Sequence, residues 1–578
     1  MGGACSRNKV HLINEDAAAK GRTGKYYKNG SSKWLLRSLS SSSSIRQKEL
    51  GKYPSLMELC IRKVCEDIRN YCCFSMLPRD ISQQIFNRLI ESYRLTDDIL
   101  EAFADCAIQD MDVGEYPGVK DNWMPIISSQ GTCLLSLDIS GSEVTDSGFS
   151  FLRDCPNLQS LFFNYCDNLS DNGIHYLSGL SNLKSLSFKK SSSVTTEGMK
   201  AFASLVNLLK LDLERCSRIH GGLFYIKDLK TLQSLNIRCC NCVTDTDMEP
   251  LSGLINLKEL QISYNRVTDN GIAQLKGLYK LELLNLEGCP VTAACLGSIS
   301  GLRALMYLNL NHCMIADEGC QNLTSFLNLR VLNLGFNDIT DASLVYIKGL
   351  TNLESLNLDS CVISDEGLKN LNDLLCLKTL ELSDTEIVGS GLPHLSGLTR
   401  LESINLSFTQ ISDHSLRHLS GLTSLRSLNL DSRKITDAGL STLTCLTRLT
   451  HLDLFGARIT DTGTSCFRHL KKLRSLEVCG GSLTDVGVMN IKDLASLIFL
   501  NLSQNCHLTD KTLELISGLT DLVSLNVSNS RITNDGLQHL RNLKKLRSLS
   551  LESCKVTATE LKKLQLSALP NIVNVRPE

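Results

Sequence analysis

The sequence predicts an α/β solenoid in which stacked strand–turn–helix units form a parallel sheet on a concave face. Two observations predict this fold. From Leu134 onward, about eighteen units of roughly 24 or 25 residues can be aligned, a period typical of solenoids that repeat one supersecondary unit. Leu recurs at fixed spacing while aromatic residues are only 5% of the chain, which suits a long, thin core built by stacking.

The thirteenth unit shows how spacing specifies each element. Leu428 and Leu430 alternate with a period of two, which predicts one face of a short strand. Leu440, Leu443 and Leu446 lie three residues apart, which predicts an α-helical or 3₁₀ segment on the opposite wall. Each unit is therefore predicted to run from strand through turn to helix.

A hydroxyl residue followed by Asp separates strand from helix in many units. The hydroxyl and the carboxylate can both accept free N–H groups of the following turn, and a negative charge suits the start of a helix. Because the pair recurs in register, we interpret these Asp residues as structural caps rather than catalytic groups. Examples are Thr340–Asp341, Ser364–Asp365, Ser412–Asp413, Thr436–Asp437 and Thr460–Asp461.

The ninth position of each unit is often Cys or Asn, small residues that can turn inward and satisfy backbone groups of the loop. They are Cys166, Cys216, Cys240, Cys289, Cys313, Cys361, Cys554, Asn265, Asn337 and Asn505. With this feature, the segment from Leu134 to Asn571 resembles the cysteine-containing leucine-rich repeats of F-box and leucine-rich-repeat proteins, especially plant ones. The resemblance implies a leucine-rich-repeat horseshoe with a parallel concave sheet, a small N-terminal helical cap and a protein-binding function.

The repeats divide the chain into five predicted regions. Residues 1–53 form a basic, Ser-rich tail that we expect to be disordered, and residues 54–107 form a helical F-box-like or capping region. Residues 108–133 are a degenerate first repeat, residues 134–571 hold the regular repeats, and residues 572–578 are a tail. Atypical ends are expected because a solenoid must close its exposed faces.

Residues 77–89 resemble the start of an F-box, with a Pro at the beginning and apolar residues on one helical face. The resemblance implies that this face docks on the Skp adaptor of a cullin ubiquitin ligase while the repeats select the substrate. The following stretch, Ile90 to Met111, lacks the Val-Cys-x-x-Trp-like segment of that family. A helix that caps the solenoid is the alternative. The predicted adaptor-binding residues are Leu77, Pro78, Ile81, Ile85, Phe86 and Leu89.

Positions 3, 5, 7 and 8 of each unit are predicted to face the concave side. Aromatic rings above a polar sheet are typical of binding hot spots, so Tyr264, Phe336, Phe408 and Phe455 are candidate partner-binding residues. Packing at the strand edge is the alternative for each ring. Position 5 is often Asn, which either hydrogen-bonds along the sheet or grips a partner's backbone. These residues are Asn236, Asn285, Asn309, Asn333, Asn357, Asn405, Asn429, Asn501 and Asn526.

The first six residues fit the myristoylation pattern, with Gly2 as acceptor, and Cys5 is a candidate for palmitoylation. Residues 1–53 contain eleven Lys and Arg against three acidic residues, an excess that would favour an anionic membrane surface. A basic tail without lipid is the alternative. We expect the protein in the cytoplasm or nucleus, or on the inner face of the plasma membrane if the N-terminus is acylated.

The composition argues against several function classes. With 60 Lys and Arg against 61 Asp and Glu, no global field favours nucleic acid. We find no phosphate-binding loop, nucleophile elbow or zinc-ligand spacing, and so predict no catalytic residue, cofactor or metal. The leading prediction is a non-enzymatic substrate receptor of a cullin ubiquitin ligase that binds an unidentified protein on its concave face. The alternative is a lipid-anchored signalling scaffold or an inhibitor that binds proteins without a ligase.

Overall fold

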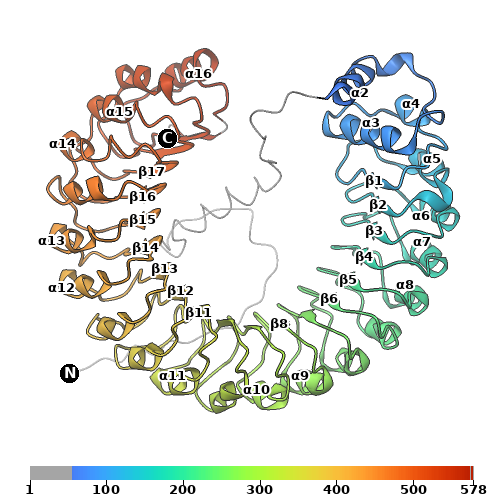
Figure 1. The fold of residues 1–578 in the computed structure, drawn as a ribbon, viewed down its shortest axis with the longest axis horizontal. Coiled ribbons are helices and arrows are strands. Elements are labelled where there is room, and N and C mark those ends of the chain that lie inside the picture. The colour runs from blue at the N-terminus through green and yellow to red at the C-terminus, as the bar shows by residue number, and fades with distance from the viewer. Residues whose placement is uncertain (1–54, 573, 577–578) are drawn as a thin grey trace. The chain divides into compact units, whose positions relative to one another are not determined.

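The computed structural model describes residues 55–572 and 574–576. The chain divides into two compact units, Met1–Lys63 and Val64–Glu578, and helix α2 (Leu56–Glu66) includes the boundary between them. The second unit holds the repeats and is described from here on. Its strands lie along the inner side of the stack and its helices along the outer side (Figure 1).

The inner side is one parallel sheet of twenty strands, in which each strand pairs with the next along the chain. Every strand has three residues. They are β1 (Asp110–Asp112), β2 (Ser136–Asp138), β3 (Ser160–Phe162), β4 (Ser185–Ser187), β5 (Lys210–Asp212), β6 (Ser234–Asn236), β7 (Glu259–Gln261), β8 (Leu283–Asn285), β9 (Tyr307–Asn309), β10 (Val331–Asn333), β11 (Ser355–Asn357), β12 (Thr379–Glu381), β13 (Ser403–Asn405), β14 (Ser427–Asn429), β15 (His451–Asp453), β16 (Ser475–Glu477), β17 (Phe499–Asn501), β18 (Ser524–Asn526), β19 (Ser548–Ser550) and β20 (Asn574–Arg576).

Strand register follows the leucines. In the β14–β15 pair, Leu428 lies opposite Leu452, and both are 1% exposed. Because side chains alternate along a strand, the flanking residues face the concave side. Strands β2 to β19 match the predicted units, so the predicted fold is confirmed. Strand β1 lies in the predicted degenerate repeat, and β20 lies within residues 572–578, where only a tail was predicted.

The outer wall consists of short helices. Apolar residues three apart suit single turns, since 3₁₀ and α segments both place them on one face. The α-helices of the second unit are α3 (Arg79–Glu91), α4 (Asp97–Glu101), α5 (Met124–Ser128), α6 (Asp146–Phe149), α7 (Asp171–Ile174), α8 (Thr196–Met199), α9 (Asp269–Ile272), α10 (Ala294–Ile299), α11 (Asp341–Ile347), α12 (Asp413–Leu416), α13 (Asp437–Leu440), α14 (Asp485–Val488), α15 (Asp510–Ile516) and α16 (Ala558–Ser567). The 3₁₀ segments are η1 (Ile68–Asn70), η2 (Asp121–Trp123), η3 (Gly131–Cys133), η4 (Ser150–Asp154), η5 (His175–Gly179), η6 (Lys200–Ser204), η7 (Gly222–Ile226), η8 (Asp245–Asp247), η9 (Glu249–Gly253), η10 (Ala273–Gly277), η11 (Cys320–Ser325), η12 (Gly367–Leu371), η13 (Leu392–Leu395), η14 (Arg417–Leu419), η15 (Ser441–Leu443), η16 (Gly463–His469) and η17 (Asn534–Asn542).

The hydroxyl–Asp pair links neighbouring repeats, which the sequence did not predict. As predicted, the Thr484 hydroxyl caps its own turn by accepting from the Val486 N–H at 3.2 Å. The Asp carboxylate of the preceding repeat does not cap its own turn. Asp461 instead accepts from the Thr484 N–H at 2.8 Å and from the Thr484 hydroxyl at 2.6 Å, so it bonds to the next repeat. We call this series the carboxylate ladder. It also includes Asp146–Ser170, Asp171–Thr195, Asp245–Thr268, Asp269–Thr292, Asp317–Thr340, Asp341–Ser364, Asp413–Thr436, Asp437–Thr460, Asp485–Thr509 and Asp510–Thr533.

The small residues at position 9 also join repeats. The Cys240 thiol donates to the Leu213 carbonyl at 3.1 Å, and the Asn337 amide donates to the Leu310 carbonyl at 2.8 Å. Both acceptors belong to the preceding repeat, where the backbone leaves the strand. The predicted inward turn of these side chains is therefore confirmed, and its partner is the neighbouring loop.

Helix α3 closes the first edge of the sheet. The Gln83 side chain donates to the Asp110 carbonyl at 2.6 Å and accepts from the Gln109 and Asp110 N–H groups at 3.1 Å. A free strand edge exposes backbone groups that invite further pairing. In β1 one glutamine satisfies part of that edge, so α3 serves as a cap.

Candidate functional site on the concave face

The eighth position of nearly every repeat has a left-handed backbone. The φ angle is +59° at both Tyr165 and Tyr264, and +56° at both Phe336 and Phe408. This conformation costs an L-residue roughly 1–2 kcal/mol, and glycine adopts it freely. The chain does place glycine there in the β2, β8, β15 and β16 repeats. Large rings at the same position are therefore not explained by backbone stability.

Three of the four predicted rings project from the sheet. The exposed fractions of Tyr264, Phe336 and Phe408 are 39%, 40% and 47%. Phe455, at position 7, is half-buried, and its N–H donates to Asp453 Oδ1 at 2.9 Å. The first three form an interrupted aromatic row along the edge at which the strands end.

Tyr165 belongs to the same row and was missed from the sequence. It is 46% exposed, and the Lys190 ammonium lies 5.8 Å from its ring centre. The available signal was its place at the eighth position of the β3 repeat, equivalent to Tyr264. Such cation–ring contacts add modest energy at exposed sites.

Some of the asparagines at position 5 hydrogen-bond along the sheet, as one alternative predicted: the Asn236 amide donates to Asp212 and the Asn501 amide donates to Glu477, each at 3.0 Å. Each side-chain oxygen turns along its own chain: Asn357 Oδ1 accepts from the Asp359 N–H at 2.8 Å, and Asn429 Oδ1 accepts from the Asp431 N–H at 3.0 Å. Asn333 makes the equivalent bond at 3.1 Å. Among the described residues, no hydrogen bond is found from Nδ2 of these three side chains. They therefore form a row of amide donors above the sheet.

A polar cluster occupies the centre of the concave face. The Tyr264 hydroxyl donates to Glu287 Oε1 at 2.9 Å, and the Arg238 guanidinium lies 5.7 Å from the Tyr264 ring centre. Burial raises the pKa of Tyr264 to about 12, assisted by the hydrogen bond to Glu287 and its negative charge. The amides of Asn309 and Asn311 each approach the Glu287 carboxylate at 3.4 Å.

This cluster contains buried polar atoms without a hydrogen-bond partner. They are Arg238 Nε, Ser263 Oγ and Asn311 Oδ1. A buried donor or acceptor left unsatisfied costs about 1–3 kcal/mol, so native proteins contain few of them. One donor, one acceptor and one hydroxyl in neighbouring repeats match the groups that a polypeptide backbone would satisfy.

Carboxylates gather on the concave face further along the stack. Burial raises the pKa of Asp431 to about 7, and the neighbouring Asp453 adds to the shift. Burial also raises the pKa of Glu381, opposed by a hydrogen bond from Asn405. Phe408 lies one repeat before Asp431. This part of the face therefore combines an exposed ring with two carboxyl groups of raised pKa, that of Asp431 being about 7.

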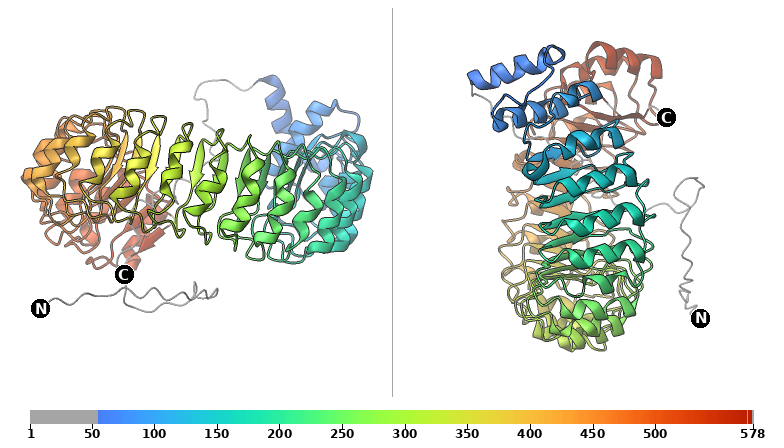
Figure 2. Two further views of the ribbon diagram at one scale, coloured as in Figure 1. Left: turned by 90° about the horizontal axis from the view of Figure 1, so that it is seen from below. Right: turned by 90° about the vertical axis from the view of Figure 1, so that its right-hand side faces the viewer.

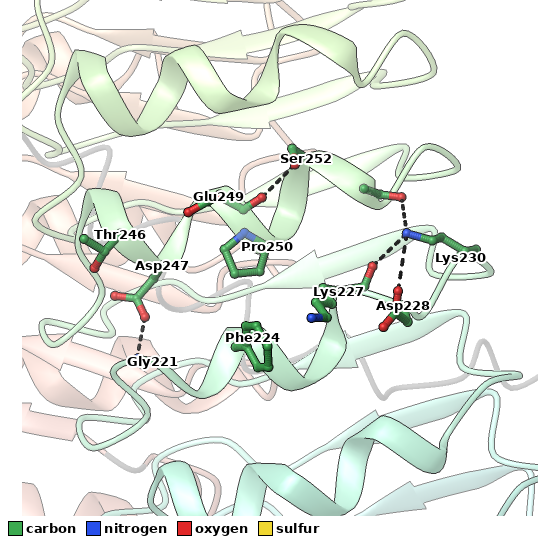
Figure 3. Close-up of a pocket in the computed structure, with 11 residues that line it drawn as sticks. Gly221, Phe224, Lys227, Asp228, Lys230, Thr246, Asp247, Glu249, Pro250 and Ser252 are labelled. Carbon is green, nitrogen blue, oxygen red and sulfur yellow. Dashed lines mark hydrogen bonds and ion pairs between the residues drawn. The ribbon is translucent and has the colours of Figure 1, made fainter.

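A hollow of about 490 Å³ opens on the outer wall where the carboxylate ladder is interrupted (Figure 3). His220 and Gly221 replace the usual hydroxyl–Asp pair, and Asp247 turns to accept from the Gly221 N–H at 2.5 Å. Lys227 covers the ring of Phe224 at 3.8 Å. Because Lys230 pairs with Asp228 and Asp247 pairs with His220, we interpret this hollow as a consequence of the missing ladder rung.

Comparison with known families agrees with this geometry. A model described as a leucine-rich repeat region matches residues 309–574, and a leucine rich repeat model matches residues 230–291. The chain is a leucine-rich-repeat solenoid. No curated protein matches the sequence.

Solved structures similar to this solenoid come from bacteria and plants. A leucine-rich-repeat protein of Leptospira interrogans is 22% identical, with 76% of this chain and 94% of that one covered and a TM-score of 0.42. A Listeria monocytogenes internalin is 25% identical, with 58% and 88% covered and a TM-score of 0.39. The Arabidopsis receptor kinase HAESA, in complex with a peptide hormone and a co-receptor, is 16% identical, with 81% and 86% covered and a TM-score of 0.45.

The F-box-like segment lies before the leucine-rich repeats, and its predicted adaptor residues are divided between surface and interior. Ile85, Phe86 and Leu89 are completely buried, and the Phe86 ring packs edge-on against Phe103 at 5.4 Å. Ile81 is half-buried. Three residues of the predicted docking face thus belong to the core of the cap, which favours the capping alternative for them.

Leu77 and Pro78 are exposed, so they alone of the predicted adaptor residues lie open to a partner. The predicted lipidation residues Gly2 and Cys5 lie outside the described residues. Within the described part, no helix has the length and apolar character needed to span a bilayer. No three or more His, Cys, Asp or Glu side chains there are arranged to hold a metal ion.

Proposed function

We propose that this leucine-rich-repeat solenoid is a receptor that binds an extended segment of a partner protein along its concave face. The observation that supports the proposal most strongly is the row of unpaired amide donors at Asn333, Asn357 and Asn429. An extended segment presents backbone carbonyls that can accept from such donors. A folded partner surface offers fewer accessible backbone groups.

The surroundings of the amide row fit the same ligand. Phe336 lies three residues past the end of β10, in the same repeat as Asn333, and receives apolar side chains of the bound segment. At the centre, Arg238 Nε and Asn311 Oδ1 lack partners in the free protein and are buried, so they gain partners only if the side chains around them move when the segment binds. Satisfying such buried groups contributes to affinity because the free protein already bears the cost of leaving them unpaired.

Selection of a displayed peptide library on the full chain, followed by fluorescence polarisation with the recovered peptides, tests the proposal. The variant Asn357→Asp keeps the acceptor for the Asp359 N–H, as Asp453 does naturally for Phe455, but loses the amide donor. We expect it to weaken binding about tenfold, the worth of one good hydrogen bond.

The matched control is Asn372→Asp, which makes the same change at an exposed residue of the outer wall. We expect this variant to bind as the wild type does. Equal affinities for the wild type, Asn357→Asp and a Phe336→Gly variant would show that peptides bind elsewhere and would rule out the concave site.

A second candidate function is that of a substrate receptor of a cullin ubiquitin ligase. The observation that favours it is an exposed apolar turn before α3, where Met76 is 92% exposed and Leu77 is 38% exposed. Because Ile85 and Phe86 are interior, changing them would unfold the cap, so the informative variant is Met76→Asp with Leu77→Asp. Co-purification of the Skp adaptor and cullin with the wild type but not with this folded variant would support the ligase function. Failure of the wild type to recover either protein would exclude it.

A further inference from the structure

The edge at which the strands begin has its own ladder, made of amides. We call it the strand-start edge and define it by the two residues before the first Leu of each unit and the residue after it. Asn182 donates to the Pro156 carbonyl at 3.1 Å, and Asn256 donates to the Lys230 carbonyl at 2.7 Å. Equivalent bonds join Asn328 to Arg303 at 2.9 Å and Asn352 to Leu327 at 2.9 Å. These bonds hold equivalent residues of successive repeats in one line along this edge of the stack.

This edge is basic, although the whole chain is nearly neutral. From Leu134 to Leu546, the acidic residues at its defining positions are Glu282, Glu354, Glu402 and Asp521. Each of them forms an ion pair with a cation of the same edge. The pairs are Glu282 with Lys258, Glu354 with Arg330 and Lys378, Glu402 with Arg426, and Asp521 with Lys545. Within the described residues Lys280, Arg303, Arg448, Lys471 and Lys472 have no ion pair. The carboxylate ladder lies in the connections that lead from the strands to the helices, which Figure 2 shows stacked side by side, whereas the cations of the strand-start edge precede the strands.

Two of these cations line a recess. The recess has a volume of about 340 Å³ and is formed by Thr231, Gln233, Asn256, Lys258 and Lys280 from three successive repeats. The Lys280 ammonium donates to Asn256 Oδ1 at 2.7 Å, which holds it at the recess. The Thr231 hydroxyl and the Asn256 amide donate to backbone carbonyls, so the donors that remain for a phosphate group are the ammonium groups of the two lysines and the Gln233 amide.

Apolar side chains project from the same line. Val206, Ile255, Tyr279 and Leu327 all occupy the second position before the first Leu of their units, with exposed fractions of 54%, 57%, 67% and 59%. Such exposure of large apolar groups in register, beside lysines, is typical of surfaces that interact. Ile255 and Tyr279 directly precede Asn256 and Lys280, so the apolar groups flank the recess.

We propose that the strand-start edge of the β5 to β10 repeats docks on an anionic lipid bilayer. The ammonium groups of Lys258 and Lys280 bind a lipid phosphate in the recess, while Ile255 and Tyr279 enter the boundary between headgroups and acyl chains. Cations alone would suit any anion, but apolar side chains on both sides of a phosphate-sized recess match a surface that offers phosphate and hydrocarbon together. The concave face stays open in this orientation, so the inference does not depend on the proposed peptide binding.

Co-sedimentation of the full chain with phosphatidylcholine vesicles, with and without phosphatidylserine, tests the proposal. We expect binding only to the vesicles that contain phosphatidylserine. The double variant Lys258→Glu, Lys280→Glu should weaken this binding by at least about thirtyfold, since each lysine near an anionic leaflet contributes about a factor of five. The control Lys348→Glu, Lys369→Glu makes the same change of net charge on the outer wall and should bind as the wild type does.

A second readout locates the contact. Tyr279→Trp should lose fluorescence when the vesicles carry bromine-labelled lipid, whereas Val345→Trp on helix α11 should not. Equal binding by the edge variant and its control would overturn the proposal, because the basic tail at residues 1–53 would then account for membrane association. Quenching at residue 345 but not at residue 279 would also overturn it.

Discussion

Carboxylates of the ladder and carboxylates of the concave face belong to the same repeats, but the pKa values of two of them are shifted in opposite directions. Burial acts to raise the pKa of Asp437, but hydrogen bonds from Thr460 and Thr462 overcome it and hold this pKa below its usual value. Burial raises the pKa of Asp431, six residues earlier, to about 7 because no comparable donors face it. The ladder carboxylates accept hydrogen bonds from the next repeat, whereas a concave carboxylate such as Asp431 lacks comparable donors. A buried carboxylate without hydrogen-bond donors reduces the stability of the fold. Because ladder carboxylates in the same repeats have such donors, the concave carboxylates are candidates for a function.

Removing a ladder carboxylate should give the largest effect on stability. Asp461→Ala leaves the N–H and hydroxyl of Thr484 without their acceptor, together with the Gly487 N–H at 3.0 Å. Hydrogen bonds to charged groups contribute about 1.5–3 kcal/mol each, so we expect a loss of about 3 kcal/mol in urea unfolding. Asp373→Ala, at an exposed residue outside the ladder, should change stability by less than about 0.5 kcal/mol. Similar losses in both variants would contradict the structural role of the ladder.

Where a glycine lies three residues after a ladder hydroxyl, it should be nearly as sensitive. A Cβ added to Gly487 would lie 2.5 Å from Asp461 Oδ1, which forces the ladder to shift. We expect Gly487→Ala to cost about 2 kcal/mol, in the range of overpacking changes, as measured by urea unfolding. Gly518→Ala is the control, since its added Cβ would meet no atom within 4 Å. Tolerance of alanine at Gly487 would show that the ladder is not rigid.

The two kinds of carboxylate should respond oppositely to pH. Asp431 has a raised pKa, so its contribution to stability is full below about pH 3.8 and is lost as the pH rises through about 7. Asp437 has a lowered pKa, so its contribution is present above its unfolded pKa and is lost as the pH falls through its folded pKa.

We therefore expect Asp431→Asn to raise the thermal midpoint above that of the wild type at pH 8, and to lose this advantage at pH 4. Thermal melts across this range are the measurement. A lower midpoint than the wild type at pH 8 would show that Asp431 stabilises the stack as an ion, against the sign predicted here.

The smallest change in stability is expected at the aromatic row. Phe336→Gly removes a left-handed non-glycine residue and a ring that is 40% exposed, so backbone relief and lost packing nearly cancel. Urea unfolding should shift by less than about 1 kcal/mol, while the affinity for selected peptides falls about tenfold or more. A large loss of stability would instead support the packing alternative for this ring.

Much of the fold was predictable because the stacking period is visible in one chain. The spacing of Leu428 and Leu430 predicted the strand, and the inward turn of Cys240 followed from its small size. The partner of Asp461 was not predictable in the same way, because Thr484 lies one repeat away and contacts it only once the strand register is known. From the sequence, the hydroxyl and the Asp were both predicted to cap the helical turn that follows them. This prediction is right for Thr484 and wrong for Asp461.

The concave site was predictable in position but not in detail. Tyr264, Phe336 and Phe408 were identified from the eighth position, and Tyr165 could have been found by the same rule. The left-handed backbone beneath them is a property of the loop, which apolar spacing does not reveal. The basic edge around Lys280 was hidden because the cations and acids of the whole chain balance, and only stacking separates them.

The central claim is that the carboxylate ladder stabilises the stack, whereas the concave asparagines bind the peptide. The most direct test of this division is to measure stability and peptide affinity in the same two variants. For Asp461→Ala, the account predicts a lower urea midpoint with unchanged affinity of the folded fraction. For Asn357→Asp, it predicts an unchanged midpoint with affinity weakened about tenfold. If Asp461→Ala weakens peptide binding as much as Asn357→Asp does, or if Asn357→Asp unfolds the stack, the division is wrong.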